Sequence, residues 1–286
     1  MEFFKNAMNR SIEEIEKTLA SFVGPDPANY PELAGYSNTD CYRDFFGGGG
    51  LYLAVNMIRT LRLRPGDLVL DLGCGKGATS IFLAKHYGVH VTALDLWTSA
   101  EYLKEKFKVQ GYHDRISAFQ MDATLPLPFP QNYFDVIFCM NSFNFYGGSV
   151  NYLQHLLQHL KPGGQLCIGS EALTREFTRE QLESPPPVYA FKLPPPNESV
   201  NVFEDDFLKQ HTPRWWKYLF QTSGLLAVEY CHELEDADLI YQELVRYEHE
   251  QQMDPFDVQI CLDQMEWGRT HQPRKTLFVL TASKPG

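Results

Sequence analysis

The spacing of hydrophobic positions changes along the chain and predicts where regular structure begins. Residues 11–22 place apolar side chains at helical spacing behind a capping-box pattern, and they predict an amphipathic helix. From residue 67 onward, short apolar runs alternate with helical patterns. The predicted strands are 68–72, 89–96, 116–122, 135–142 and 165–171, with helices at 78–88, 99–110 and 150–160. Such alternation indicates parallel βαβ units and an α/β fold.

The pattern loosens after residue 171. Two triple-proline runs between 184 and 196 favour polyproline II segments. Farther on, the predicted elements are a helix at 213–224, strands at 225–234 and 276–283, and helical stretches at 235–252 and 255–267. We therefore expect an N-terminal lid segment over residues 1–50 and one α/β domain over 51–286, with helical or irregular lid insertions at 172–212 and 235–272.

Composition narrows the class of protein. The 286 residues are 44% hydrophobic, enough for a full core, and carry a formal net charge of −11 with no basic cluster. Such a surface repels phosphate backbones, so we expect neither nucleic acid nor membrane lipid as a partner. The N-terminus lacks the apolar segment of a signal peptide, no apolar run reaches membrane-spanning length, and the six cysteines are scattered. These features predict a soluble, cytoplasmic protein.

One motif carries candidate chemistry. The segment DLGCGKG, residues 71–77, lies where a predicted strand ends and a helix begins. Its glycines allow a tight turn and let the backbone approach a ligand closely, and the following helix presents free N–H groups. Asp95 ends the next strand, where its carboxylate can accept hydrogen bonds from both hydroxyls of a ribose. The motif therefore predicts a nucleotide-like ligand.

The same residues also satisfy a dinucleotide fingerprint, Gly73-x-Gly75-x-x-Ala78 with Asp95, so a nicotinamide-dependent oxidoreductase is an alternative. Three features favour a different ligand. Asp71 places an acid beside the loop, which suits an amino group and a sulfonium and repels a pyrophosphate. Asp122 ends the third strand, where it can meet an adenine amino group. The chain also lacks a second βαβαβ half.

The stretches VLDLGCGKGATSIFLA, ALDLW, the pair Asp122–Ala123, FDVIFCMNSFNF and LKPGG resemble the successive motifs of class I S-adenosylmethionine-dependent methyltransferases. The resemblance covers roughly residues 50–230 and is strongest to the bacterial small-molecule subgroup related to ubiquinone/menaquinone-type methyltransferases. It implies a Rossmann-like, doubly wound, seven-stranded, mostly parallel sheet with a reversed last strand. It also implies S-adenosylmethionine as cofactor.

The resemblance assigns cofactor contacts residue by residue. The glycine loop and Asp95 would hold the ligand and its ribose, Asp122 the adenine amino group, and Trp97 would flank the adenine. Asn141, which ends the fourth predicted strand, would lie near the methionine moiety. The full set of implied cofactor residues is Asp71, Gly73, Gly75, Gly77, Asp95, Leu96, Trp97, Asp122, Ala123 and Asn141.

The methyl acceptor is not fixed by the resemblance, because the segments outside the motifs vary. Those segments are rich in aromatic residues and proline, which suits the walls of an enclosed pocket for a small molecule. The candidate lining residues are Tyr42, Phe45, Phe145, Tyr146 and Trp215. Tyr146 fits a core position equally well. Trp215 and Trp216 point about 100° apart on a helix and cannot both face one pocket.

Two residues are candidates for acid–base work. Glu171 ends the fifth predicted strand and could orient or deprotonate an acceptor, or cap the next segment; it favours an acceptor with cationic character. His211 is a second candidate base. His155 and His159 have a metal-ligand spacing, but a leucine stripe leaves them on the solvated face of their helix, with no third ligand in view. We expect no metal.

The sequence thus predicts methyl transfer from S-adenosylmethionine to a small molecule by in-line displacement, under a lid hinged at the glycines 47–50. Besides the oxidoreductase, a non-catalytic S-adenosylmethionine sensor remains an alternative. The pattern specifies neither the methylated atom of the acceptor nor the oligomeric state.

Overall fold

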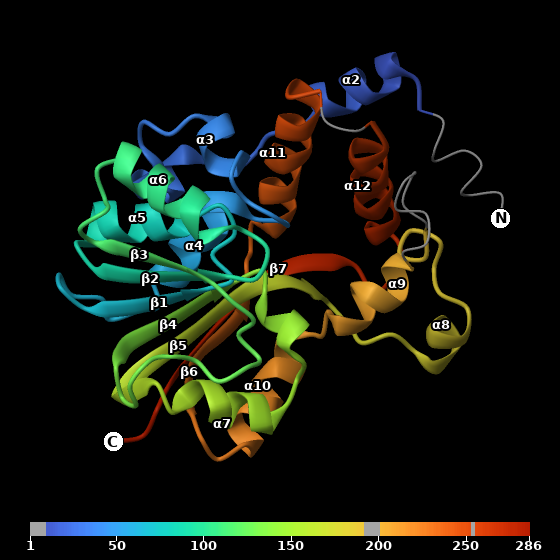
Figure 1. The fold of residues 1–286 in the computed structure, drawn as a ribbon. Coiled ribbons are helices and arrows are strands. Elements are labelled where there is room, and N and C mark those ends of the chain that lie inside the picture. The colour runs from blue at the N-terminus through green and yellow to red at the C-terminus, as the bar shows by residue number, and fades with distance from the viewer. Residues whose placement is uncertain (1–9, 192–200, 253–254) are drawn as a thin grey trace.

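A computed structural model describes residues 10–191, 201–252 and 255–286. Its centre is a seven-stranded sheet in the order β3-β2-β1-β4-β5-β7-β6 (Figure 1). The strands are β1 Leu68–Leu72, β2 His90–Asp95, β3 Ile116–Gln120, β4 Phe134–Met140, β5 Leu160–Leu173, β6 Ala227–Glu233 and β7 Lys275–Ser283. β7 runs antiparallel to both β5 and β6, and the other pairs are parallel. The expected doubly wound sheet with a reversed last strand is confirmed.

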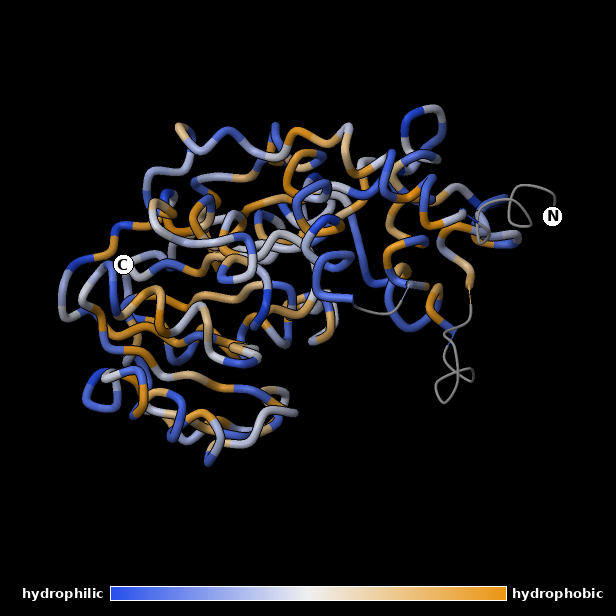
Figure 2. The backbone as a smooth tube through the Cα atoms, turned by 90° about the horizontal axis from the view of Figure 1, so that it is seen from above, coloured by the Kyte–Doolittle hydropathy of each residue, from blue (hydrophilic) through white to orange (hydrophobic). Residues whose placement is uncertain are grey.

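Helices cover both faces of the sheet (Figure 1). One face carries α4 Gly50–Ile58, α5 Ala78–Tyr87 and α6 Ala100–Val109, and the other carries α7 Val150–Leu157 and α10 Pro213–Thr222. The strands are buried on both sides, which is why they read as continuous apolar runs. Figure 2 shows hydrophobic stretches running through the body, with hydrophilic stretches mostly at its outside.

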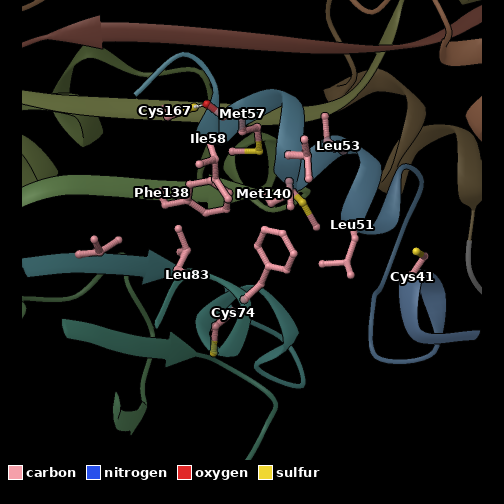
Figure 3. Packing of buried hydrophobic residues seen from close by; sticks show 14 of the residues in the cluster. Cys41, Leu51, Leu53, Met57, Ile58, Cys74, Leu83, Phe138, Met140 and Cys167 are labelled. Atoms are coloured by element: carbon pink, nitrogen blue, oxygen red, sulfur yellow. Dashed lines mark hydrogen bonds between the residues drawn. The ribbon is translucent and has the colours of Figure 1, made fainter. Parts of the chain in front are cut away.

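The packing of α4 on the sheet depends on one small residue. Met57 and Ile58 of α4 lie over Phe138 of β4 (Figure 3). At Gly169 of β5, an added Cβ would collide with the side chain of Met57. Glycine at this position therefore sets the close approach of α4 to β5, because interiors are packed too densely to absorb an extra methyl group without a shift.

The segments outside this core pack on one another. The helices here are α2 Ile12–Ala20, α3 Asn38–Tyr42, α8 Arg179–Glu183, α9 Val202–Asp205, α11 Ala237–Glu250 and α12 Pro255–Gly268. Short 3-10 turns are Pro27–Asn29, Pro31–Leu33, Phe143–Tyr146 and Phe207–Lys209. Ile15 of α2 packs with Val245 of α11 and Val258 of α12. Tyr189 and Phe207 pack with Trp267 of α12. The described parts of 1–50, 172–212 and 235–272 thus contact one another through α11 and α12 (Figure 1).

Three expectations about local structure are wrong. α7 ends at Leu157, and β5 runs from Leu160 through the Pro-Gly-Gly segment at 162–164 that was expected to separate helix from strand. The prolyl residue is tolerated because the β4–β5 register shifts there, between Phe134 and Val136. β5 also continues past Glu171 to Leu173, because this end pairs with the long reversed strand β7.

The third wrong expectation concerns the proline-rich stretch 184–196, of which residues 192–200 lie outside the described part. The stretch was expected to form polyproline II segments, but residues 187–189 form a turn. Val188 and Tyr189 are fully buried, and the Tyr189 hydroxyl donates to the carbonyl oxygen of Pro273 at 2.8 Å. Within the described ranges, no helix combines the length and the apolar character that crossing a membrane requires.

Candidate active site

A cavity of about 620 Å³ lies at the carboxyl edge of the sheet. Its wall takes residues from the segments that follow β1, β2, β3 and β4, from the end of β5, and from two segments outside the core, 44–47 and 206–210. This edge, where the strand order reverses direction between β1 and β4, is the usual ligand site of doubly wound sheets.

Asp95 fixes the loops at one end of the cavity. Its Oδ2 accepts a hydrogen bond from the Gly75 amide at 2.9 Å, and its Oδ1 accepts from the amides of Trp97 at 2.9 Å and Thr98 at 2.8 Å. The carboxylate therefore joins the glycine loop after β1 to the loop after β2. Asp95 also lines the cavity and is only 7% exposed.

Asp71 lies beneath the glycine loop rather than on the cavity wall. It is 1% exposed, and its Oδ2 accepts hydrogen bonds from the hydroxyls of Thr79 and Ser80 at 2.5 and 2.6 Å. Burial raises the pKa of this carboxyl group to about 6. The expectation that Asp71 contacts a ligand directly thus gains no support, because its side chain is used to attach the loop to the start of α5.

The other glycines of the motif differ in position. Gly73 and Gly75 line the cavity, and both have positive φ, 73° and 53°. An added Cβ at Gly73 would collide with the Ser142 side chain, and one at Gly75 would lie 3.2 Å from the Phe46 ring. Gly77 packs instead against Phe107, outside the wall. Two of the three predicted glycines therefore face the cavity.

The segments after β2 and β3 complete the wall at the Asp95 end of the cavity. Leu96 and Trp97 line the cavity, and Trp97 is 78% exposed. Asp122 also lines it, while its Oδ1 accepts from the Thr124 amide and hydroxyl at 2.8 and 2.7 Å. These hydrogen bonds lower the pKa of Asp122. Asp122 is thus both a turn residue and a wall residue, whereas Ala123 is buried in the core and does not line the cavity.

Asn141 follows β4 with a left-handed backbone, φ 54°, and lines the middle of the cavity. Its Nδ2 donates to the carbonyl oxygens of Phe46 at 3.2 Å and Gly48 at 2.8 Å. Its Oδ1 is buried and has no donor among the described residues. Asn141 therefore holds the glycine-rich segment in place beside the cavity. Its own side-chain carbonyl oxygen remains without a hydrogen-bond donor.

At the β5 end, Glu171 lines the cavity and pairs with Lys275 of β7 at 2.9 Å. The Tyr241 hydroxyl of α11 donates to the same carboxylate oxygen at 3.0 Å. Both charged side chains are about 15% exposed, so this is a mostly buried ion pair. Nearby Glu171 raises the pKa of Lys275 against the opposing effect of burial. The lysine was not predicted from sequence, because β7 carries no motif.

Only some of the aromatic residues predicted to line the acceptor pocket do line the cavity. Phe45, Phe145 and Tyr146 line the cavity. Tyr42 does not: it is 2% exposed, and its hydroxyl donates to the Ile240 carbonyl oxygen at 3.0 Å, because α3 packs against α11. Trp215 also lies outside the wall; its indole fills the space above Gly148, where an added Cβ would collide with it. The pocket prediction for Tyr42 and Trp215 is therefore not supported.

The histidines lie away from the cavity wall. His211 stacks on Trp215 with ring centroids 3.8 Å apart, and its Nδ1 lies 3.0 Å from a Glu176 oxygen. It is one residue from cavity-lining Gln210 but is not part of the wall, so its role as a base gains no support from this placement. His159 was expected on a solvated face, but it is 3% exposed, with Nδ1 3.1 Å from the Pro130 carbonyl oxygen.

Sequence reasoning also missed several wall residues. Ser142 and Asn144 follow β4 directly, so the position after a strand could have identified them. Asp206 and Gln210 come from the irregular insertion and had no periodic signal. In the part of the chain that the structure describes, no three His, Cys, Asp or Glu side chains are grouped as metal ligands.

Comparison with known proteins finds similarity over the segment that carries part of this site. Residues 69–164 match a family model described as a methyltransferase domain. The chain is 30% identical over 135 residues to phosphoethanolamine N-methyltransferase of Triticum aestivum, covering 45% of this chain and 26% of the relative. It is 34% identical over 106 residues to 2-methyl-6-phytyl-1,4-hydroquinone methyltransferase of Synechocystis sp., covering 37% and 32%. The chain thus spans about a third or less of the length of these relatives.

Among solved structures, Haemonchus contortus phosphoethanolamine N-methyltransferase 2 in complex with S-adenosyl-L-methionine superposes with a TM-score of 0.66. The identity is 15%, and the match covers 92% of this chain and 60% of that one. At this identity the likeness establishes the fold.

Proposed function

We propose that the chain is a class I S-adenosylmethionine-dependent methyltransferase that transfers a methyl group from S-adenosylmethionine to a small molecule, in agreement with the match of residues 69–164 to a methyltransferase domain. The observation that carries the proposal is the composition of one cavity. Gly73, Gly75, Asp95 and Asp122 form one end, and the other end is walled by Glu171 and residues from outside the core. One cavity therefore offers room for a nucleoside and for a second ligand beside it.

The residues at the first end fit S-adenosylmethionine. Two cavity-lining glycines leave the backbone free of side chains where a ligand must approach closely. Acids at the ends of β2 and β3 are placed to accept hydrogen bonds from ribose hydroxyls and an amino group. Asn141 carries a buried carbonyl oxygen without a donor among the described residues, which suits an N–H of the methionine moiety. The fit supports the predicted assignments at Asp95, Asp122 and Asn141.

Bound S-adenosylmethionine supplies an activated methyl group on a sulfonium, which a nucleophile displaces in line. The protein's part is to hold two ligands in register and to exclude water. Asp95 fixes the loop that receives the nucleoside, and Asn141 fixes the segment at 46–48 that covers the middle of the cavity. Phe45, Phe145 and Tyr146 provide an apolar and aromatic part of the wall.

We propose that residues 1–50, 172–212 and 235–272 act as the lid of this domain. Their described parts pack together and contribute Phe45, Asp206 and Gln210 to the wall. We further propose a small acceptor in the cytoplasm rather than nucleic acid, in agreement with the net charge of −11 and six free cysteines.

The wall argues against the oxidoreductase alternative. A dinucleotide carries a pyrophosphate, yet no Lys, Arg or His lines the cavity within the described chain, and several carboxylates do. A non-catalytic sensor would bind S-adenosylmethionine through the same residues, and it would differ from a methyltransferase only in lacking turnover.

Calorimetry with S-adenosylhomocysteine and, separately, with NADH tests the proposal. We expect binding of the former and none of the latter. Incubation with methyl-labelled S-adenosylmethionine and a panel of small metabolites should then release S-adenosylhomocysteine. NADH binding would support the oxidoreductase. Tight binding without turnover on any acceptor would support the sensor, and absence of S-adenosylhomocysteine binding would reject the proposal.

A further inference from the structure

The cavity wall is acidic, but most of its carboxylates already have partners. The acids are Asp44, Asp95, Asp122, Glu171 and Asp206. Asp44 pairs with Lys106 at 2.7 Å, Asp95 accepts from backbone amides, and Asp122 accepts from Thr124. The charge that remains to be balanced therefore lies at the β5 end, with Glu171 and Asp206.

At that end one of the two carboxylates has no ion-pair contact. Glu171 is neutralised by Lys275, but Asp206 has no ion pair among the described residues, and its Oδ1 accepts only from Gln210 Nε2 at 3.1 Å. Lys209, the nearest lysine in sequence, donates its Nζ hydrogen to the Asp205 carbonyl oxygen instead. Burial and the Glu171 carboxylate raise the pKa of Asp206, and Lys275, Lys209 and the hydrogen bond from Gln210 only partly oppose this rise. A negative charge on Asp206 is therefore incompletely compensated within the described chain.

An unfilled acceptor lies beside this carboxylate. Gln210 lines the cavity and is 4% exposed. Because its Nε2 donates to Asp206, the orientation of its amide is fixed, and its Oε1 has no donor in the described ranges. Asn144, also on the wall and 8% exposed, likewise has an Oδ1 without a donor. Buried acceptors of this kind require N–H or O–H donors, and a ligand in the cavity can supply them.

We propose that the β5 end of the cavity binds the methyl acceptor through a cationic N–H group, held by the Asp206 carboxylate and the Gln210 carbonyl oxygen. The acceptor accordingly carries an ammonium group that serves for binding, and this inference rests on the proposed function. The atom that attacks the methyl group is a different one with a free electron pair, because the ammonium nitrogen has none. A charge-assisted hydrogen bond would place a cation in direct contact with Asp206, and the Gln210 Oε1 would take a second N–H. A carboxylate or phosphate acceptor would meet repulsion there.

Three probes of similar size and different charge test the inference on the wild-type protein. Benzylamine, benzyl alcohol and phenylacetate are titrated by calorimetry into protein saturated with S-adenosylhomocysteine. We expect benzylamine to bind about tenfold or more tightly than benzyl alcohol, and phenylacetate not to bind. Equal or tighter binding of the neutral or anionic probe, or no binding of benzylamine, would overturn the inference.

A matched pair of variants tests the residue. Asp206→Asn keeps the shape and the hydrogen bond from Gln210 and removes the charge. Asp205→Asn makes the same change at the adjacent, exposed residue. We expect Asp206→Asn to abolish the preference for benzylamine over benzyl alcohol and Asp205→Asn to leave it unchanged. An unchanged preference in Asp206→Asn would contradict the assignment.

S-adenosylhomocysteine affinity, measured in the same variants, separates this inference from the proposed function. If S-adenosylhomocysteine does not bind the wild-type protein, the proposed function fails. If it binds normally and the charge preference is absent, only the amine assignment fails.

Discussion

Asn141 Nδ2 donates a hydrogen bond to the Gly48 carbonyl oxygen at 2.8 Å and so joins the end of β4 to the segment that precedes α4. This contact crosses the cavity between two parts of the chain that are 93 residues apart. The glycines at 47–50 were predicted to be a hinge. In this structure the same segment is tied down at two carbonyl oxygens, so any opening requires these hydrogen bonds to break.

Two substitutions at Asn141 distinguish the effect of its side-chain hydrogen bonds, which tether the 46–48 segment, from the effect of its left-handed backbone conformation. Asn141→Gly keeps access to φ 54° and removes the hydrogen bonds, whereas Asn141→Ala also adds strain of roughly 1–2 kcal/mol. We expect chymotrypsin to cut after Phe45 or Phe46 faster in both variants, and the alanine variant to be the less stable one in urea. Asn132→Gly, at another asparagine with φ 52°, is the control. Unchanged cleavage in Asn141→Gly would show that the tether is unimportant.

Asp95→Ala should weaken S-adenosylhomocysteine binding by roughly 2–4 kcal/mol, because ribose hydroxyls would lose a charged acceptor. It should also cost stability, about 1–3 kcal/mol, because three backbone amides lose the same carboxylate. Calorimetry and urea unfolding measure the two effects. Asp114→Ala, at a side chain that is 87% exposed, is the control. A folded variant with unchanged affinity would refute the ribose assignment.

Glu171→Gln should destabilise the fold by about 3 kcal/mol, because it leaves the Lys275 ammonium mostly buried without its countercharge. The double variant Glu171→Gln with Lys275→Met should be less destabilised than the sum of the single variants, because the pair is removed together. Urea unfolding of all four proteins measures the coupling. S-adenosylhomocysteine affinity should stay unchanged in Glu171→Gln. Strictly additive stabilities would mean that the pair contributes no coupling.

Glu248 of α11 should make the fold less stable as the pH rises. Burial, reinforced by Asp257, raises the pKa of this carboxyl group from 4.5 to about 7, and its Oε2 has no donor among the described residues. The folded protein therefore binds the proton more tightly than the unfolded chain. Stability is fully present below pH 4.5 and falls by roughly 1–3 kcal/mol as the pH rises through 7.

Unfolding of wild type and Glu248→Gln between pH 5 and 8 measures this dependence. The difference between the two proteins isolates Glu248, because Asp71, whose pKa is raised to about 6, contributes equally to both and cancels. Glu250→Gln, at an exposed glutamate of the same helix, is the control. If the stability of Glu248→Gln falls with pH as steeply as that of wild type, the assignment is wrong.

The sequence by itself determined the core and the first end of the cavity. Apolar runs of strand length, glycines that adopt positive φ, and acids directly after strands are local signals. In a parallel sheet, strand ends converge on one edge, so the order of the predicted elements alone places Asp95, Asp122 and Asn141 together.

Tertiary structure alone decided the rest. Whether Asp71 faces a ligand or lies under the loop depends on Thr79 and Ser80, and Tyr42 was directed inward by the packing of α3 on α11. The partner of Glu171 comes from β7, far along the chain, which pairs antiparallel with β5 so that Lys275 arrives beside it. Side-chain direction and long-range pairing result from the packing of the whole chain, and no local pattern of hydrophobic and polar residues encodes them.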